Sequence, residues 1–142
     1  MEIKYLNNKI NTVTYGTEGS AAFDLQASID DKVILWPGET IIIPSGISIS
    51  INDKNIAALV MPRSGQSIHH LVVANSPGLI DSDYLGEIGI IAHNDGDSQI
   101  VINPRERIAQ LMFVPVIFPV FRTVEEFSKK TDRGVNGFGH TG

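Results

Sequence analysis

Short runs of β-branched and other apolar residues recur along the chain, and turn residues separate them. The run at 46–51 alternates between apolar and polar side chains, as a strand with one buried face does. Trp36-Pro37-Gly38 and Pro44-Ser45-Gly46 are typical turn signals between such runs. On these criteria we predict strands at residues 33–35, 40–43, 46–51, 56–61, 71–74, 87–93, 99–102 and 108–116.

Two further signals complete the predicted architecture. Asn94-Asp95-Gly96 lies between two of the apolar runs and predicts a hairpin turn. Segment 123–130 has a helical pattern, because Thr123 can cap its N-terminus and Glu126, three residues later, completes a capping box. Several short strands at modest spacing predict an all-β fold of the jelly-roll type, a sandwich or barrel, with one short helix near 123–130.

Length and composition limit the class of protein. A chain of 142 residues is long enough for one domain with a hydrophobic core and too short for two of ordinary size. The N-terminus lacks the basic head and apolar core of a secretory signal, and no apolar run is long enough to span a bilayer. We therefore expect a cytoplasmic protein, or one in the host cytosol if a virus encodes it, with no membrane partner.

Composition also narrows the chemistry. The chain has no cysteine, which excludes disulfides, thiol nucleophiles and thiolate metal sites. None of its four histidines has the i, i+4 spacing of a helical zinc pair. The net charge of −5 argues against a nucleic-acid partner, because non-specific affinity for nucleic acids comes mainly from basic residues that face phosphates. A small anionic ligand would need positive charge close to its own site.

Three loop-like segments carry polar residues inside otherwise apolar sequence. Asp24, in segment 19–27, is either a solvated aspartate at a strand end or a functional carboxylate. Met61-Pro62-Arg63-Ser64-Gly65 offers a guanidinium, a hydroxyl and an accessible backbone N–H, which together suit a phosphate. The third segment, 75–87, holds three carboxylates within seven residues, and its spacing does not match an EF-hand loop.

These segments occur in the order of the five motifs of the trimeric dUTPases, and the chain resembles that family over roughly residues 19–142. The matching segments are 22–27, 62–65, 78–87, 107–110 and the glycine-rich tail. The most specific are Gly-Leu-Ile-Asp-Ser-Asp-Tyr at 78–84 and Arg-Gly-x-x-Gly-Phe-Gly-His-Thr-Gly at 133–142. The resemblance implies a jelly roll, a homotrimer with active sites shared between subunits, and Mg²⁺-dependent hydrolysis of dUTP to dUMP and pyrophosphate.

The resemblance also implies catalytic and metal-binding roles. Asp81 matches the general base that orients and deprotonates the attacking water, and Gln110 matches a catalytic residue near that water and the phosphates. Tyr84 matches the ring beneath the deoxyribose that leaves no room for a 2′-hydroxyl. Asp24 is expected to reach Mg²⁺ through the water shell of the ion, which the substrate phosphates hold.

Further substrate contacts follow from the same resemblance. Asn75, Gly78 and the strand through Gly89 are expected to read uracil, largely through backbone groups. Ser64 and Gly65 match contacts to the α- and β-phosphates. The remaining substrate-binding residues are Arg63, which braces the site, Arg133 with Gly139, His140 and Thr141 at the γ-phosphate, and Phe138 over uracil.

The glycine-rich tail is expected to differ from the packed part of the chain. Residues 133–142 contain four glycines and cannot form a packed element alone, so we expect a β domain over 1–132 and a flexible lid over 133–142. Asn136 stands where the family commonly has a glycine, and the segment 66–74 is one residue shorter than the common form.

Three alternatives stay open. A dUTPase relative that acts mainly as a nucleotide-binding regulatory protein would keep the binding residues. A related dCTP deaminase would share the fold but needs a glutamate base and different loop motifs. A structural jelly-roll trimer would have no need for a phosphate-binding tail. The presence of Asp81, Gln110 and Arg133 favours hydrolysis.

Overall fold

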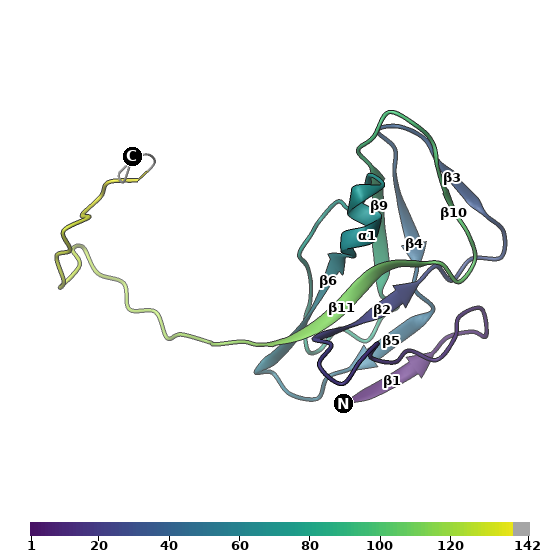
Figure 1. Ribbon diagram of the computed structural model, residues 1–142. Coiled ribbons are helices and arrows are strands. Elements are labelled where there is room, and N and C mark those ends of the chain that lie inside the picture. The colour runs from purple at the N-terminus through teal and green to yellow at the C-terminus, as the bar shows by residue number, and fades with distance from the viewer. Residues whose placement is uncertain (138–142) are drawn as a thin grey trace.

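The protein is described from a computed structural model, which covers residues 1–137 (Figure 1). These residues form eleven strands and one short helix. In chain order the elements are β1 (Glu2–Tyr5), β2 (Ala22–Gln26), β3 (Val33–Leu35), β4 (Thr40–Pro44), β5 (Ile47–Ser50), β6 (Ile56–Pro62), α1 (Ser64–Ile68), β7 (Leu71–Val73), β8 (Gly78–Ile80), β9 (Gly89–Asn94), β10 (Ile100–Ile102) and β11 (Arg107–Pro115).

The strands form two larger sheets and two ribbons. The four-stranded sheet has the order β2-β11-β6-β8, and the three-stranded sheet has the order β4-β9-β7. β1 pairs with β5, and β10 pairs with β3. Both larger sheets contribute to one core cluster, for example Leu25 and Leu111 from the first and Ile43 and Ile90 from the second. The predicted jelly-roll class is confirmed, as an open sandwich within the described residues and not as a closed barrel.

A register shift in β11 sets the orientation of the side chains that face the site. The pairing of β11 with β2 is irregular between Arg107 and Ala109, as at a β-bulge. Ile108 and Ala109 are consecutive and both buried, whereas strict alternation would expose one of them. Normal alternation resumes after the shift, so that Gln110 points away from the core between the buried Ala109 and Leu111.

Most of the expected strands are confirmed, with ends that differ by a residue or two. The sequence pattern missed β1, β2, β8 and α1, which are short or interrupted by polar residues. The predicted hairpin at Asn94-Asp95-Gly96 is wrong. The chain does turn there, but β9 pairs with β4 and β7 whereas β10 pairs with β3. The buried Asn94 side chain instead ties the end of β9 to β3 and to the loop before β10, because its amide donates to the Leu35 and Ser98 carbonyls.

The predicted helix at 123–130 is also wrong, because this segment has no regular structure. The capping signal of Thr123 and Glu126 is local, and an isolated helix of eight residues is marginal in water without a surface to pack on. The helix that the structure does contain, α1, immediately follows Arg63.

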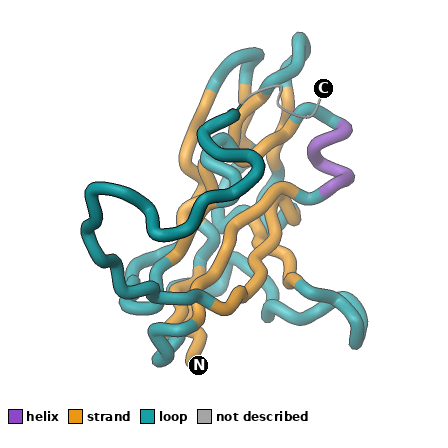
Figure 2. The backbone as a smooth tube through the Cα atoms, turned by 90° about the vertical axis from the view of Figure 1, so that its left-hand side faces the viewer, coloured by secondary structure: helices purple, strands orange, loops and turns teal. Residues whose placement is uncertain are grey.

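The chain beyond β11 leaves the β body as an extended arm (Figures 1 and 2). The last backbone bond that ties it to the body joins the Val116 N–H to the Asn55 carbonyl at 2.7 Å. Large apolar side chains on the arm face solvent, with Val120 at 99%, Phe121 at 89% and Phe127 at 88% exposure. Apolar exposure on this scale is typical of surfaces that bind a partner.

No helix among residues 1–137 has the length and apolar character needed to cross a membrane.

The turn between β4 and β5 yields a stability prediction. Gly46 has a φ of +75°, and a Cβ there would lie 2.7 Å from the Ser28 hydroxyl. Gly46→Ala should lower the free energy of unfolding by about 2–4 kcal/mol, through left-handed strain and overpacking. Gly38 has the same φ but nothing within 4 Å of the added Cβ, so Gly38→Ala should cost only about 1–2 kcal/mol. Denaturant unfolding at matched protein concentration measures both, and equal losses would contradict the packing argument.

Candidate functional site

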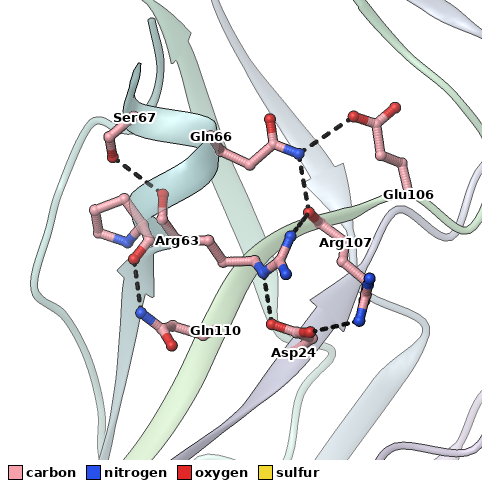
Figure 3. A network of polar contacts seen from close by, with 8 residues as sticks. Asp24, Arg63, Gln66, Ser67, Glu106, Arg107 and Gln110 are labelled. Carbon is pink, nitrogen blue, oxygen red and sulfur yellow. Dashed lines mark hydrogen bonds and ion pairs between the residues drawn. The ribbon is translucent and has the colours of Figure 1, made fainter. Parts of the chain in front are cut away.

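A group of charged residues lies at one end of the four-stranded sheet, and Asp24 is its centre (Figure 3). One Asp24 carboxylate oxygen lies 2.6 Å from Arg63 Nε, and the other lies 3.3 Å from Arg107 Nη1. The side chains of Asp24 and Arg63 are 29% and 28% exposed, so the ion pair is only partly solvated. β2 supplies Asp24, the end of β6 leads to Arg63, and β11 begins with Arg107.

Arg63 links three strands through a single side chain. Its Nη1 donates to the Arg107 carbonyl at 2.9 Å, while its Nε pairs with Asp24. Gln66 on α1 donates to the same carbonyl at 3.1 Å, which holds the helix against β11. Ser64 and Gly65 follow Arg63 directly and are exposed at the start of α1. An added Cβ at Gly65 would meet nothing within 4 Å, so its backbone is open to a ligand.

Gln110 lies on the central strand of this group. It is opposite Asp24 on β2 and opposite Met61 on β6. Its side-chain amide donates to the Pro62 carbonyl at 2.9 Å. The structure therefore brings together Asp24, Arg63, Ser64, Gly65 and Gln110, which the sequence analysis assigned to the phosphates and the metal.

A second group of predicted residues lies on the segment between β8 and β9. The Tyr84 N–H donates to the Asp81 carbonyl at 3.2 Å, and the Tyr84 hydroxyl donates to the Glu87 carbonyl at 3.0 Å. Gly86 allows this arrangement, because a Cβ there would overlap the Tyr84 phenol. Asp81 and Tyr84 are both exposed.

The residues expected to read uracil surround the same segment. Gly78 begins β8 and is buried; an added Cβ would lie 3.0 Å from the side-chain amide of Asn75. Gly89 begins β9, where an added Cβ would lie 3.0 Å from Ile42. At both glycines the lack of a side chain lets a neighbouring group approach the backbone closely.

The two groups do not meet within one chain. β6 pairs with β11 on one side, where Met61 faces Gln110, and with β8 on the other, where Ala58 faces Ile80. Asp81 follows Ile80 directly and lines a pocket with Ala57, four residues along β6 from Met61. Asp81 and Gln110 are thus two strand spacings and four residues apart. At about 4.8 Å per strand and 3.3 Å per residue, their Cα atoms lie roughly 16 Å apart.

The remaining predicted residues lie on the arm or beyond the described range. Arg133 is exposed, and its Nε donates to the Asn136 carbonyl at 3.0 Å. The part of the arm that carries Arg133 extends away from the β body, in which the other described site residues lie (Figure 1). Phe138, Gly139, His140 and Thr141 lie outside the described residues.

Sequence reasoning gave no role to Arg107 or Gln66. Arg107 binds Asp24 and offers its carbonyl to Arg63, and Gln66 donates to that carbonyl. Arg107 begins the segment 107–110 that was matched to the family, which was the available signal. Gln66 contacts Arg107 through the tertiary fold alone, so nothing in its local sequence marks it.

The side chains around Asp24 suit a hard cation such as Mg²⁺ that is held mainly by groups outside the protein. No cluster of three potential metal-ligating side chains occurs among residues 1–137. Asp24 is the carboxylate within the arginine-rich group, and arginines already engage both of its oxygens. Mg²⁺ usually keeps several waters and takes few protein ligands, so a water-mediated contact to Asp24 fits without breaking these ion pairs.

The fold and these residues define a β-sandwich protein with an arginine-rich group at one sheet end and the Asp–Tyr segment, residues 81–87, at the other. The family model described as dUTPase matches residues 8–142. The deoxyuridine 5′-triphosphate nucleotidohydrolase of Hydrogenovibrio crunogenus is 44% identical, over 100% of this chain and 97% of that protein. The Klebsiella pneumoniae protein of the same name is 50% identical, over 91% of this chain and 85% of that protein.

A solved structure agrees. The dUTPase of Staphylococcus bacteriophage 80alpha with dUPNHPP superimposes with a TM-score of 0.90 at 28% identity, covering 99% of this chain and 97% of that chain. The chain belongs to the dUTPase family and is an enzyme that hydrolyses dUTP.

The contacts of Asp24 yield a prediction about stability. Asp24→Asn removes the charge that faces two arginines and should lower the free energy of unfolding by about 1–3 kcal/mol. The matched control is Asp30→Asn. Asp30 also forms an ion pair, with Lys9 at 2.6 Å, but its side chain is 74% exposed. That change should cost no more than about 0.5 kcal/mol. Denaturant unfolding compares the two variants, and equally small losses would show that Asp24 does not brace the sheet end.

Proposed function

We propose that the enzyme cleaves dUTP to dUMP and pyrophosphate by attack of water on the α-phosphate, with Asp81 as the general base. Family membership over residues 8–142 is the observation that carries the reaction. Asp81 is exposed on a segment that its own carbonyl helps to close, through the bond from the Tyr84 N–H. A carboxylate held in this way can orient a water and accept its proton when the phosphate charge is neutralised.

Substrate selection belongs to the same segment. The Tyr84 ring is proposed to pack beneath the deoxyribose and to exclude a 2′-hydroxyl. Asn75, Gly78 and Gly89 would read uracil, mainly through backbone groups. The 3.0 Å approach of the Asn75 side-chain amide to the Cβ position of Gly78 supports this assignment, because it places two of these residues side by side. Fixed backbone groups reject a base with the wrong hydrogen-bonding pattern strongly.

The arginine-rich group would bind the triphosphate. Arg63, Ser64 and Gly65 would contact the phosphates, and Gln110 would lie near both the phosphates and the attacking water. Mg²⁺ would be held by the phosphates with Asp24 reached through water, and when bound it supplies neutralisation of the developing negative charge. The ion pair with Asp24 orients Arg63 for this purpose before substrate arrives.

We further propose a homotrimer with shared sites. A separation of roughly 16 Å along and across the sheet is too long for Asp81 and Gln110 of one chain to act on the same phosphorus. A site that holds both groups therefore takes them from different subunits. The exposed apolar side chains of the arm support this assembly, because they need a neighbour to cover them. Residues 133–142 would then close over a neighbouring site as a lid, with Arg133, Gly139, His140 and Thr141 at the γ-phosphate and Phe138 over uracil.

The comparisons bear differently on the alternatives to dUTP hydrolysis. The relatives are named for dUTP hydrolysis, which favours this reaction over dCTP deamination. The phage structure belongs to work that describes phage dUTPases as controlling the transfer of virulence genes. At 28% identity, that role is a property of the phage protein.

The reaction is tested with a nucleotide panel. With Mg²⁺ present, pyrophosphate release from dUTP should exceed release from dTTP, dCTP or UTP at least about 100-fold, because both base and sugar are read. A chelator should abolish it. Colorimetric pyrophosphate detection at equal nucleotide concentrations makes the comparison. Turnover of dCTP or UTP similar to that of dUTP would refute the specificity argument.

The shared site is tested by mixing two inactive proteins. Asp81→Asn alone should lower kcat by about 10²–10⁴, and Gln110→Ala should also be strongly impaired. If the two are dissociated and reassembled in equal amounts, each mixed trimer holds one site with both groups intact. Activity should then recover to about one quarter of wild type under closed threefold symmetry.

The controls for this experiment are each variant taken through the same procedure alone, and mass-tagged subunits that verify exchange. Activity that stays at the level of the single variants after verified exchange would place Asp81 and Gln110 of one chain in the same site.

A further inference from the structure

Glu87 has two contacts that the proposed chemistry does not use. Its side chain is exposed at the edge of the Asp–Tyr segment, yet one carboxylate oxygen accepts the Gly46 N–H at 2.8 Å. Gly46 is buried in the turn between β4 and β5 with a φ of +75°. The Gly46 carbonyl is also engaged, by the Leu6 N–H at 2.9 Å. Glu87 therefore reaches across 41 residues of sequence to a rigid backbone group.

Ile88, the residue after Glu87, already anchors the start of β9. The Ser45 N–H donates to the Ile88 carbonyl at 3.1 Å, and the Ile88 N–H donates to the Ile47 carbonyl at 3.0 Å. Ile88 is fully buried. These backbone bonds and this burial remain if the Glu87 side chain is removed. The carboxylate therefore adds little to the folding of β9, and its effect falls on the residues immediately before it.

Those residues form a short chain of hydrogen bonds that ends at the catalytic aspartate. The Glu87 carbonyl accepts the Tyr84 hydroxyl at 3.0 Å, and the Tyr84 N–H donates to the Asp81 carbonyl at 3.2 Å. Gly86 lets the phenol lie across the turn. Glu87 thus fixes the tip of the Tyr84 ring, and its carboxylate fixes Glu87 itself to Gly46.

We propose that Glu87 is a positioning residue for sugar discrimination: its carboxylate, bound to the Gly46 N–H, holds its own carbonyl where the Tyr84 hydroxyl is bonded. Tyr84 is then held at its backbone N–H and at its hydroxyl, and a ring held in this way excludes a 2′-hydroxyl more strongly than one that can tilt away. This inference rests on the proposed role of Tyr84 in the sugar site.

The test measures kcat and KM for dUTP and for UTP in wild type and variants. Glu87→Ala should lower the ratio of kcat/KM for dUTP over UTP by about 10- to 100-fold, mainly through KM, with the melting temperature within a few degrees of wild type. Glu87→Gln should restore the ratio, because an amide oxygen still accepts the Gly46 N–H. Tyr84→Phe removes the other bond of the chain and should lower the ratio as well.

Glu39→Ala is the matched control. Glu39 also accepts a backbone N–H at 2.8 Å within a turn, from Trp36, but lies outside the proposed site. Glu39→Ala should leave the ratio of kcat/KM for dUTP over UTP unchanged. If Glu87→Ala kept the wild-type ratio, the inference would be overturned. If Glu87→Ala failed to fold, the same ratio in Tyr84→Phe would overturn it. A wild-type enzyme that does not prefer dUTP to UTP would instead refute the proposed sugar site. Titration of the variants with a non-hydrolysable dUTP analogue separates loss of binding from loss of turnover.

Discussion

The arrangement of the site depends on β11, which is hydrogen-bonded to two strands at once. β2 lies on one side of it and β6 on the other. Because register in a sheet is fixed over the whole paired length, this double pairing brings Asp24, Gln110 and the end of β6 to one level. The register shift after Arg107 then points Gln110 away from the core. Arg63 reaches back across β11 to Asp24, which fixes the arginine-rich end of the sheet before any ligand is present.

The same sheet that collects these groups keeps Asp81 away from them. β6 is the strand shared by β8 and β11, and its length separates Asp81 from Gln110. A rigid sheet cannot fold back on itself to close that distance, which is why the proposed site takes Asp81 and Gln110 from different subunits. The arm leaves Val120 and Phe121 exposed. The proposed trimer would account for both features, because neighbouring chains would complete the site and cover the arm.

The Asp–Tyr segment shows how a short irregular stretch is made rigid without regular secondary structure. Two hydrogen bonds within it, a glycine at the point of closest approach and the bond that Glu87 accepts from the Gly46 N–H hold Tyr84 relative to Asp81. This last bond comes from the turn between β4, which lies in the three-stranded sheet, and β5, which pairs with β1. Under the proposed role of Tyr84, substrate selection would therefore be connected through Gly46 to the packing of the sandwich.

The sequence by itself determined the β class, most strands and the family, because alternation and turn residues act over a few positions and the family motifs are local stretches of sequence. The tertiary structure decided what depends on distant partners. Gln66 joined the site through its contact with Arg107, and the strands beside Asn94 paired with others instead of each other. The cap at Thr123 did not produce a helix, since a short helix needs a surface to pack on. The separation of Asp81 from Gln110 within one chain followed from strand order, which no local pattern records.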